Sequence, residues 1–371
     1  MLLCDKIHHK DMEKHLILIE KIYIINMYEF FGGGGIMSLI KAYDIAIDFG
    51  TSTTQVHIKG KGVTFNQPSC IAVSKETGKV IAIGSRAKNM TGKVNDKIAI
   101  IHPVKNGTID NIEAARLLMK YILDSIGFGT IKGSTVMLSI PCDHTEIEKR
   151  CLLDMVLHAG ARKAYIIKKP VAVAIGNGIN VSNPSAWMIV SIGAGICEAA
   201  VVTLGTTPVF ETIKTGTDEF DLKIMKYMRE KHGLLIGKNS AEKAKIEAGN
   251  VFSLESELSA ELSGRSLYTA LPSKEVITGE EMKELLKEPV DEIINMIKDL
   301  ISDTPPELML EIKQNGIILD GGGANLKGLG ELIVYETGLK VTKAQEPELS
   351  TVMGTAKALN QLKILIKTGI V

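Results

Sequence analysis

The chain has 371 residues, which is long enough for two or more domains with sizeable cores. Its 45% hydrophobic content is ordinary for a globular protein and excludes disorder as the default state. The 43 basic and 43 acidic residues cancel, so no global electric field attracts nucleic acid or anionic lipid, and we expect no nucleic-acid partner.

Residues 1–36 differ from the rest of the chain. The stretch "HLILIEKIYIINMYEFF" is apolar but is broken by Glu20 and Lys21, so it is neither a persuasive transmembrane span nor a signal peptide. The run "GGGGIM" suggests a translated purine-rich ribosome-binding site, and we therefore expect synthesis to start at Met37. The alternative is a membrane-surface anchor formed by Leu16, Ile17, Leu18 and Ile19.

The segment "YDIAIDFGTSTTQVHIKGKG" predicts a β-hairpin with a corner of small residues. Ile45 and Ile47 alternate in its first strand, and Val56 and Ile58 alternate in its second. Such a corner can bring backbone N–H groups close to a phosphate, while Asp48 can hold a hydrated magnesium ion. Taken alone, a β-turn with polar residues is the simpler interpretation.

Helical patterns fill the intervals between strands. "DNIEAARLLMKYIL" predicts a helix with Asp110 as its N-cap, and "DHTEIEKRCLLDMVLHAG" predicts one that begins with a Thr145 and Glu148 capping box and stops at Gly160. The alternation of strands and helices indicates an α/β fold.

The hairpin plan recurs about halfway along the chain. "WMIVSIGAGICEAAVVTL" aligns Ser191 with Asp48 and Gly193 with Gly50, which predicts two similar domains that each offer one loop to a shared cleft. A third corner, "IILDGGGANLKGL", has three consecutive glycines that allow close backbone approach to a nucleoside.

These motifs resemble those of the actin and heat-shock chaperone ATPase superfamily, and most closely the bacterial actins of the MreB family. The resemblance runs from about Tyr43 to the C-terminus, through "IDFGTSTTQVHIKGKG", "NQPSCIAV", "IHPVKNGTI", "EIEKRCLLDMVLHAGARKAYII", "AVAIGNGINVSNPSAWMIV", "GTDEFD", "NSAEKAKIEAGNVF", "TPPEL" and "GGGANLKGLGEL". It implies an α/β actin-like ATPase fold with two related domains, or four subdomains, around a nucleotide cleft.

The resemblance also implies how the chain is divided and what it does. Domain I is expected over 37–180, domain II over 181–350, and a C-terminal helix returning to domain I over 351–371. The implied function is a cytoplasmic filament of this protein, peripheral at the inner face of the cell membrane, that organises cell-wall synthesis and cell shape. The implied partners are further copies of the chain, the membrane surface and membrane proteins of wall synthesis.

The implied cofactors are ATP and Mg²⁺, with Asp48 holding the metal through water. The purine side of the cleft is expected at Glu242 and Lys245, which would otherwise be interpreted as a solvated helix face. The nucleotide-binding residues carried over from the family pattern are Asp48, Gly50, Thr51, Ser52, Thr53, Gly193, Ala194, Gly195, Glu242, Lys245, Gly321, Gly322, Gly323 and Ala324.

Several positions depart from the family pattern at the reaction centre. Family members commonly carry two glutamates where this chain has Lys168 and Lys169, and the second is thought to position the water that attacks the γ-phosphate. An ammonium has donors but no acceptor. Ser191 replaces an acidic residue near the metal, Ile196 replaces a threonine, and Thr217 stands where a glycine is usual. We therefore expect ATP binding with impaired hydrolysis and no intact catalytic residue.

A membrane contact is expected in "DSIGFGTIKGSTV", where Phe128 and Ile131 are apolar residues flanked by glycines. The alternative is that both side chains pack into their own subdomain.

Two other functions stay open at this stage: a fully active, dynamic ATPase filament, and a chaperone or reactivating factor of the same superfamily. The end of the chain directly after "STVMGTAKALNQLKIL" argues against the chaperone. A zinc site and a thiol nucleophile are not expected, because the cysteines and histidines show no ligand spacing and Cys197 has no evident base partner. The residues concerned are Cys4, Cys70, Cys142, Cys151, Cys197, His57, His102, His144 and His158.

Overall fold

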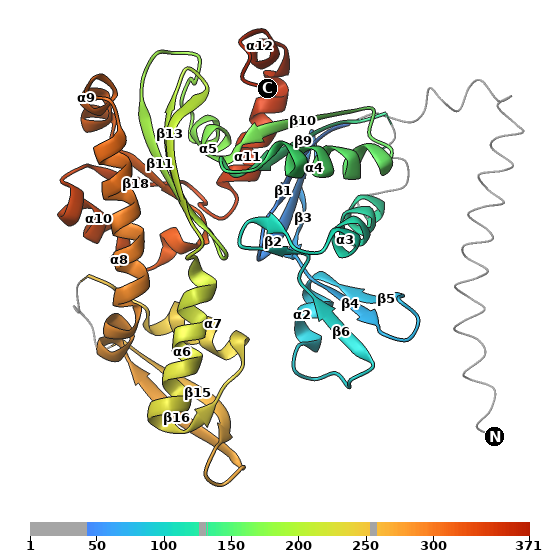
Figure 1. Cartoon of the computed structure of the whole chain (residues 1–371), viewed down its shortest axis with the longest axis vertical. Helices are drawn as coiled ribbons and strands as arrows, with labels where there is room; N and C mark the ends of the chain where they lie inside the picture. Colours follow the sequence, from blue (N-terminus) through green and yellow to red (C-terminus); the bar gives the residue numbers. More distant parts are fainter. Residues whose placement is uncertain (1–42, 126–130, 132, 253–257) are drawn as a thin grey trace, which may run out of the picture.

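The computed structural model of the chain describes residues 43–125, 131, 133–252 and 258–371. In Figure 1 these residues form two halves side by side, each built on a five-stranded sheet. The predicted start at Met37 and the alternative anchor at residues 16–19 lie outside the described residues.

The first large sheet has the strand order β10-β9-β1-β2-β3. Strands β1, β2 and β3 form an antiparallel meander, and β9 and β10 continue the sheet in parallel with β1. The strands are β1 (Asp44–Phe49), β2 (Thr53–Ile58), β3 (Gly62–Pro68), β9 (Thr135–Ile140) and β10 (Lys163–Lys168).

The second large sheet repeats this plan in the order β13-β12-β11-β17-β18. An antiparallel meander of three strands is again extended by two parallel strands on the side of its first strand. The strands are β11 (Trp187–Ile192), β12 (Cys197–Thr203), β13 (Thr206–Ile213), β17 (Ile317–Asp320) and β18 (Val341–Lys343). The two halves therefore have the same topology, as the repeated hairpin motif predicted.

Helices cover both faces of each sheet, which explains why neighbouring residues of the central strands, such as Ile45, Ala46 and Ile47 of β1, are all buried. The core on the outer face of the first sheet is completed by α3 (Ile112–Ser125) and α4 (Glu146–His158). Between the two sheets lie α5 (Lys169–Gly176) and α11 (Ser350–Asn360), whose core includes residues from both sheets. A short helix, α12 (Leu362–Lys367), ends the fold.

The contact between α5 and α11 depends on small residues. A Cβ placed on Gly354 would lie 1.8 Å from the carbonyl oxygen of Ala172. Only glycine allows this approach, so the helix that carries Lys169 at its first residue is held tightly against the C-terminal helix.

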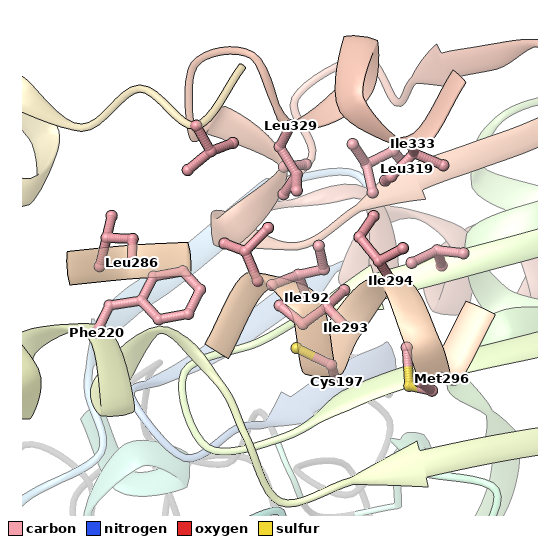
Figure 2. Close-up of a cluster of buried hydrophobic side chains, with 14 of the residues drawn as sticks. Ile192, Cys197, Phe220, Leu286, Ile293, Ile294, Met296, Leu319, Leu329 and Ile333 are labelled. Atoms are coloured by element: carbon pink, nitrogen blue, oxygen red, sulfur yellow. The ribbon is translucent and has the colours of Figure 1, made fainter. Parts of the chain in front are cut away.

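The outer face of the second sheet carries the largest helices. Figure 2 shows Phe220 of α6 packed near Leu286 and Ile293 of α8, all fully buried. The elements on this side are α6 (Thr217–His232), α8 (Gly279–Asp303), α9 (Pro306–Asn315), the 3₁₀ turn η2 (Gly322–Asn325) and α10 (Leu329–Thr337).

Smaller units extend each half at the lower end in Figure 1. One unit joins the sheet β5-β4-β6 to α2, and the other joins β14-β15-β16 to α7. A two-stranded ribbon, β7-β8, lies in the first half. The bounds are β4 (Ile71–Ser74), β5 (Val80–Ile83), α2 (Gly84–Met90), β6 (Ile98–Ile101), β7 (Val104–Lys105), β8 (Thr108–Ile109), β14 (Leu234–Leu235), α7 (Lys238–Ala248), β15 (Ser259–Ser266) and β16 (Pro272–Thr278).

Two local predictions can be compared directly. The capping box of Thr145 and Glu148 is confirmed at the start of α4. The N-cap of α3 was predicted one residue too early: the side chain of Asn111, not Asp110, accepts the backbone N–H of Ala114 at 2.9 Å. Asn111 directly precedes the first helical residue, which is where a capping side chain reaches the third N–H group.

Candidate nucleotide-binding site

A cleft of about 430 Å³ opens between the two halves. The predicted glycine corners all contribute to its wall, together with the helices α5 and α7. The predicted residues that line it are Asp48, Gly50, Thr51, Ser52, Thr53, Lys169, Ser191, Gly193, Ala194, Gly195, Ile196, Thr217, Glu242, Lys245, Gly321 and Gly322.

The first two corners have the same backbone hydrogen bond. Gly50 N–H donates to the Thr53 carbonyl at 3.0 Å, and Gly193 N–H donates to the Ile196 carbonyl at 2.9 Å. An added Cβ at Gly50 would lie 2.7 Å from the Thr53 oxygen, so a side chain is excluded there. Each corner thus exposes bare backbone toward the cleft, the arrangement that suits a phosphate.

The corners also approach one another through the loop between β7 and β8. Gly107 N–H donates to Thr51 Oγ1 at 3.0 Å, and a Cβ on Gly195 would lie 2.9 Å from that same oxygen. Ile196 fills the remaining space, with its Cδ1 2.8 Å from where a Cβ on Gly107 would stand. An apolar group therefore occupies the place where the family pattern has a threonine hydroxyl.

The two lysines before Pro170 point to different places. Lys169 Nζ lies 2.9 Å from Asp48 Oδ1 in the cleft wall, and the two side chains are 19% and 14% exposed. Lys168 does not line the cleft; its Nζ donates to Thr207 Oγ1 at 2.8 Å and lies over the ring of Phe210. Of this pair, Lys169 is the one that lines the cleft.

The charge of Lys169 is strongly held. Burial alone lowers the pKa of this ammonium, but the charge and hydrogen bond of Asp48, with smaller contributions from Glu198 and Asp320, raise it above its ordinary value. Lys169 is therefore a fixed cation in the cleft, and it has no lone pair with which to orient an attacking water.

Two buried carboxylates in the same wall were not predicted from the sequence. Glu198 Oε1 accepts the backbone N–H of Cys142 at 2.9 Å, while its Oε2 has no hydrogen-bond partner among the described residues. Burial raises the pKa of Glu198, and it raises the pKa of Asp320 to about 6. The repeated hairpin could have revealed Glu198. It faces Ser191 across the second hairpin, just as Gln55 faces Asp48 across the first.

Asp320 also changes the meaning of the serine at position 191. In the first half, Ser139 Oγ donates to Asp48 Oδ1 at 2.9 Å across parallel strands. In the second half, Ser191 Oγ lies 3.3 Å from Asp320 Oδ2 across the equivalent pair of strands. The first half has its carboxylate on β1 and its serine on β9, whereas the second half has its serine on β11 and its carboxylate on β17. The acidic group absent at 191 is therefore present on the neighbouring strand.

The expected magnesium ion does not fit these residues. Asp48 Oδ1 already accepts from Lys169 and Ser139, and a divalent cation at this carboxylate would stand against the ammonium. We therefore assign no metal role to Asp48.

On the purine side, both predicted charged residues are already paired. Glu242 Oε2 lies 2.8 Å from Lys88 Nζ of α2, across the cleft. Lys245 Nζ lies 2.7 Å from Asp221 Oδ1 and donates to the Thr217 carbonyl at 3.0 Å. Their carbon stems remain in the cleft wall, where they can cover one face of a base.

The third glycine corner contributes only in part. Gly321 and Gly322 line the cleft, and Gly321 has a φ of +84°, a conformation that favours glycine. Gly323 and Ala324 are buried and do not line the cleft, so their assignment to the nucleotide stays a prediction; a Cβ on Gly323 would lie 2.1 Å from Ile192 Cγ2. That glycine serves packing between η2 and β11.

The expected membrane wedge is not supported at its one described residue. Ile131 is 7% exposed and belongs to the core of the first half, so the alternative of packing into its own subdomain holds for this side chain. Phe128 lies outside the described residues. Among the helices that the structure describes, none is both long and apolar enough to cross a membrane.

Two halves of equal topology with glycine corners facing a shared cleft define the actin-like class of nucleotide-binding proteins. Solved structures agree: MreB5 of Spiroplasma citri bound to AMPPNP has a TM-score of 0.84 and 30% sequence identity, with 89% of this chain and 99% of that one covered. A MamK double helical filament, 22% identical with a TM-score of 0.73, shows the fold alone. The predicted α/β actin-like fold is confirmed.

The sequence profile of the MreB/Mbl protein family matches residues 42–367, and the chain belongs to this family. "Cell shape-determining protein Mbl" of Bacillus cereus is 33% identical over 330 residues, covering 89% of this chain and 99% of the relative. "Cell shape-determining protein MreB" of Escherichia coli K12 is 32% identical over 325 residues, covering 86% and 94%. The resemblance stated from sequence motifs is therefore confirmed.

Proposed function

We propose that this protein binds ATP in the cleft, assembles into actin-like filaments and hydrolyses the bound nucleotide slowly. We further propose that the filament acts in cell-shape control at the inner face of the cytoplasmic membrane, with wall-synthesis proteins as partners. The names of the relatives support the role in cell shape, and the AMPPNP-bound structure of the Spiroplasma relative supports the nucleotide.

One observation carries the proposal of slow hydrolysis: Lys169 Nζ lies 2.9 Å from Asp48 Oδ1. An attacking water needs an acceptor that orients its proton, and this position offers only donors. Asp48 offers no replacement at Oδ1, since Ser139 and Lys169 both bond that atom. Losing one positioned group of this kind typically costs about 10²–10³ in rate.

The rival function is a fully active ATPase, and one observation favours it. Glu198 lines the cleft, and its Oε2 is buried without a partner, so an acceptor is present within the same wall. If Glu198 orients the water, then Glu198→Gln lowers phosphate release sharply. On the proposal made here that substitution leaves an already slow rate nearly unchanged.

Filament formation is tested with purified protein on a lipid monolayer, viewed by electron microscopy with ATP, with ADP and without nucleotide, alongside calorimetry of nucleotide binding. We expect filaments and saturable binding. Gly50→Val is the matched negative control, since its Cβ would collide with the Thr53 carbonyl at the phosphate corner. Absence of nucleotide binding, or monomers under all conditions, would contradict the proposal.

A further inference from the structure

We propose that the Lys169 ammonium takes the place of a divalent cation in this cleft, so that ADP or ATP binds without a metal ion. The inference rests on the proposed function, because it concerns nucleotide bound in the same cleft. It also goes beyond slow hydrolysis, since it concerns how the phosphate charge is neutralised.

Geometry is the first support. Lys169 begins α5, and α5 is clamped against α11 by the close approach of Gly354 to the Ala172 carbonyl. Its Nζ is fixed at 2.9 Å from Asp48 Oδ1, beside the first glycine corner. The positive charge is therefore tethered at the phosphate end of the cleft and need not be recruited from solution.

Charge balance is the second support. Five carboxylates line the cleft, and three of them, those of Asp48, Glu198 and Asp320, act on the charge of Lys169. Glu198 Oε2 and Asp320 Oδ1 are buried and have no hydrogen-bond partner in the part of the chain that the structure describes. Without Lys169 this wall would repel a polyphosphate, and a lysine is a recognised point-charge ligand for phosphate. The ammonium therefore neutralises part of the negative charge of the carboxylates and also attracts the incoming phosphate.

The poor fit of a metal is the third support. A hydrated magnesium ion in a nucleotide site is held by one or two carboxylates, but here Asp48 Oδ1 is already engaged by Lys169 and Ser139. An ion placed beside Asp48 would also be repelled by the ammonium next to it. The same site cannot hold both an ammonium and a divalent cation, and in this protein it holds the ammonium of Lys169.

The test is the dissociation constant of ADP and of ATP, measured by calorimetry once in excess EDTA and once in excess MgCl₂. For the unmodified protein we expect the two conditions to agree within about threefold. Lys169→Met keeps the stem and removes the charge, so its affinity in EDTA should fall about 10-fold or more, with partial recovery when Mg²⁺ is added. Lys169→Arg should keep tight binding in EDTA.

Lys168→Met is the matched control, because this neighbouring lysine bonds Thr207 outside the cleft, and its affinity in EDTA should be unchanged. Binding by the unmodified protein that weakens 10-fold or more in EDTA would overturn the inference while leaving the proposed function standing. Absence of binding in both conditions would overturn both. If Lys169→Met does not fold, as judged by thermal unfolding, the comparison in the unmodified protein still decides.

Discussion

Lys88 Nζ lies 2.8 Å from Glu242 Oε2, and this ion pair joins α2 to α7 from opposite sides of the nucleotide cleft. The ion pair thus links the smaller units of the two halves, which face each other in Figure 1, and its Glu242 lines the cleft. Glu242 was expected to contact the purine, and in the structure its carboxylate is engaged by the opposite half.

We predict that this ion pair slows nucleotide exit. The side chains are 35% and 36% exposed, so the pair contributes about 1 kcal/mol at most, which corresponds to a rate change of about fivefold at most. Lys88→Met should therefore raise the dissociation rate of a fluorescent ADP, measured by stopped flow. Added salt should raise the rate of the unmodified protein toward that of the variant. Lys79→Met, at an exposed lysine, is the control. Equal rates for Lys88→Met and the unmodified protein would show that the pair does not gate the cleft.

The contact between Gly107 and Ile196 predicts a coupled effect on stability. Gly107→Ala introduces a residue at φ +77° and places its Cβ 2.8 Å from Ile196 Cδ1, so we expect a loss of about 2 kcal/mol. Ile196→Val removes the nearest atom and should reduce that loss to about 1 kcal/mol. Gly60→Ala isolates the backbone cost, since Gly60 has φ +82° and a Cβ added there would meet no other part of the described structure within 4 Å. Thermal unfolding of the single and double variants measures the coupling, and strictly additive effects would refute the contact.

Asp320 should make stability depend on pH in a direction opposite to that of a salt-bridged acid. Burial raises its pKa from 3.8 to about 6, so the folded state holds this proton more tightly than the unfolded state does. Its stabilising contribution is complete below pH 3.8 and is lost as the pH rises through about 6, a change of about 3 kcal/mol.

Asp320→Asn removes this titration, so the variant should gain stability relative to the unmodified protein as the pH rises from about 4 to about 6.5. Unfolding midpoints across that range provide the measurement. Asp124→Asn, at an exposed carboxylate on α3, should give a curve parallel to that of the unmodified protein. A parallel curve for Asp320→Asn as well would mean that Asp320 titrates normally in the folded state.

Restoring the family pattern should require several changes together. Lys169→Glu alone should recover little phosphate release, because Ser191 and Ile196 remain. Adding Ser191→Asp and Ile196→Thr should recover more than the single changes combined. Because Ser191 Oγ is 3.3 Å from Asp320 Oδ2, the new carboxylate would face an existing one, so adding Asp320→Asn should increase the recovery further. If adding Asp320→Asn to the triple variant lowers phosphate release, then Asp320 does not stand in for the acidic residue absent at Ser191.

The local motifs predicted much of the site because they depend on residues close together in the chain. The corners at Gly50 and Gly193 follow from strand, turn and strand within one hairpin, and they have the same hydrogen bond. The domain boundaries at 180/181 and 350/351 stay a prediction, although the order of elements shows two halves of equal topology.

Contacts between distant segments could not be predicted in the same way. The pairing of Lys169 with Asp48 requires that β9 lie between β1 and β10, and the Asp320 contact requires β17 beside β11. A motif read along the chain contains no information on this order. The packing of Gly323 against Ile192 could not be predicted either, since a glycine needed for packing and one needed for a ligand look alike in sequence.

The most direct test of the account is phosphate release at saturating ATP, compared with a family member that carries glutamate at the position of Lys169. Calorimetry on the same preparation first establishes that the nucleotide is bound. We expect release slower by about 10² or more, and no further large loss in Glu198→Gln. Release as fast as in the relative, abolished by Glu198→Gln, would show that Glu198 orients the water and would contradict the account.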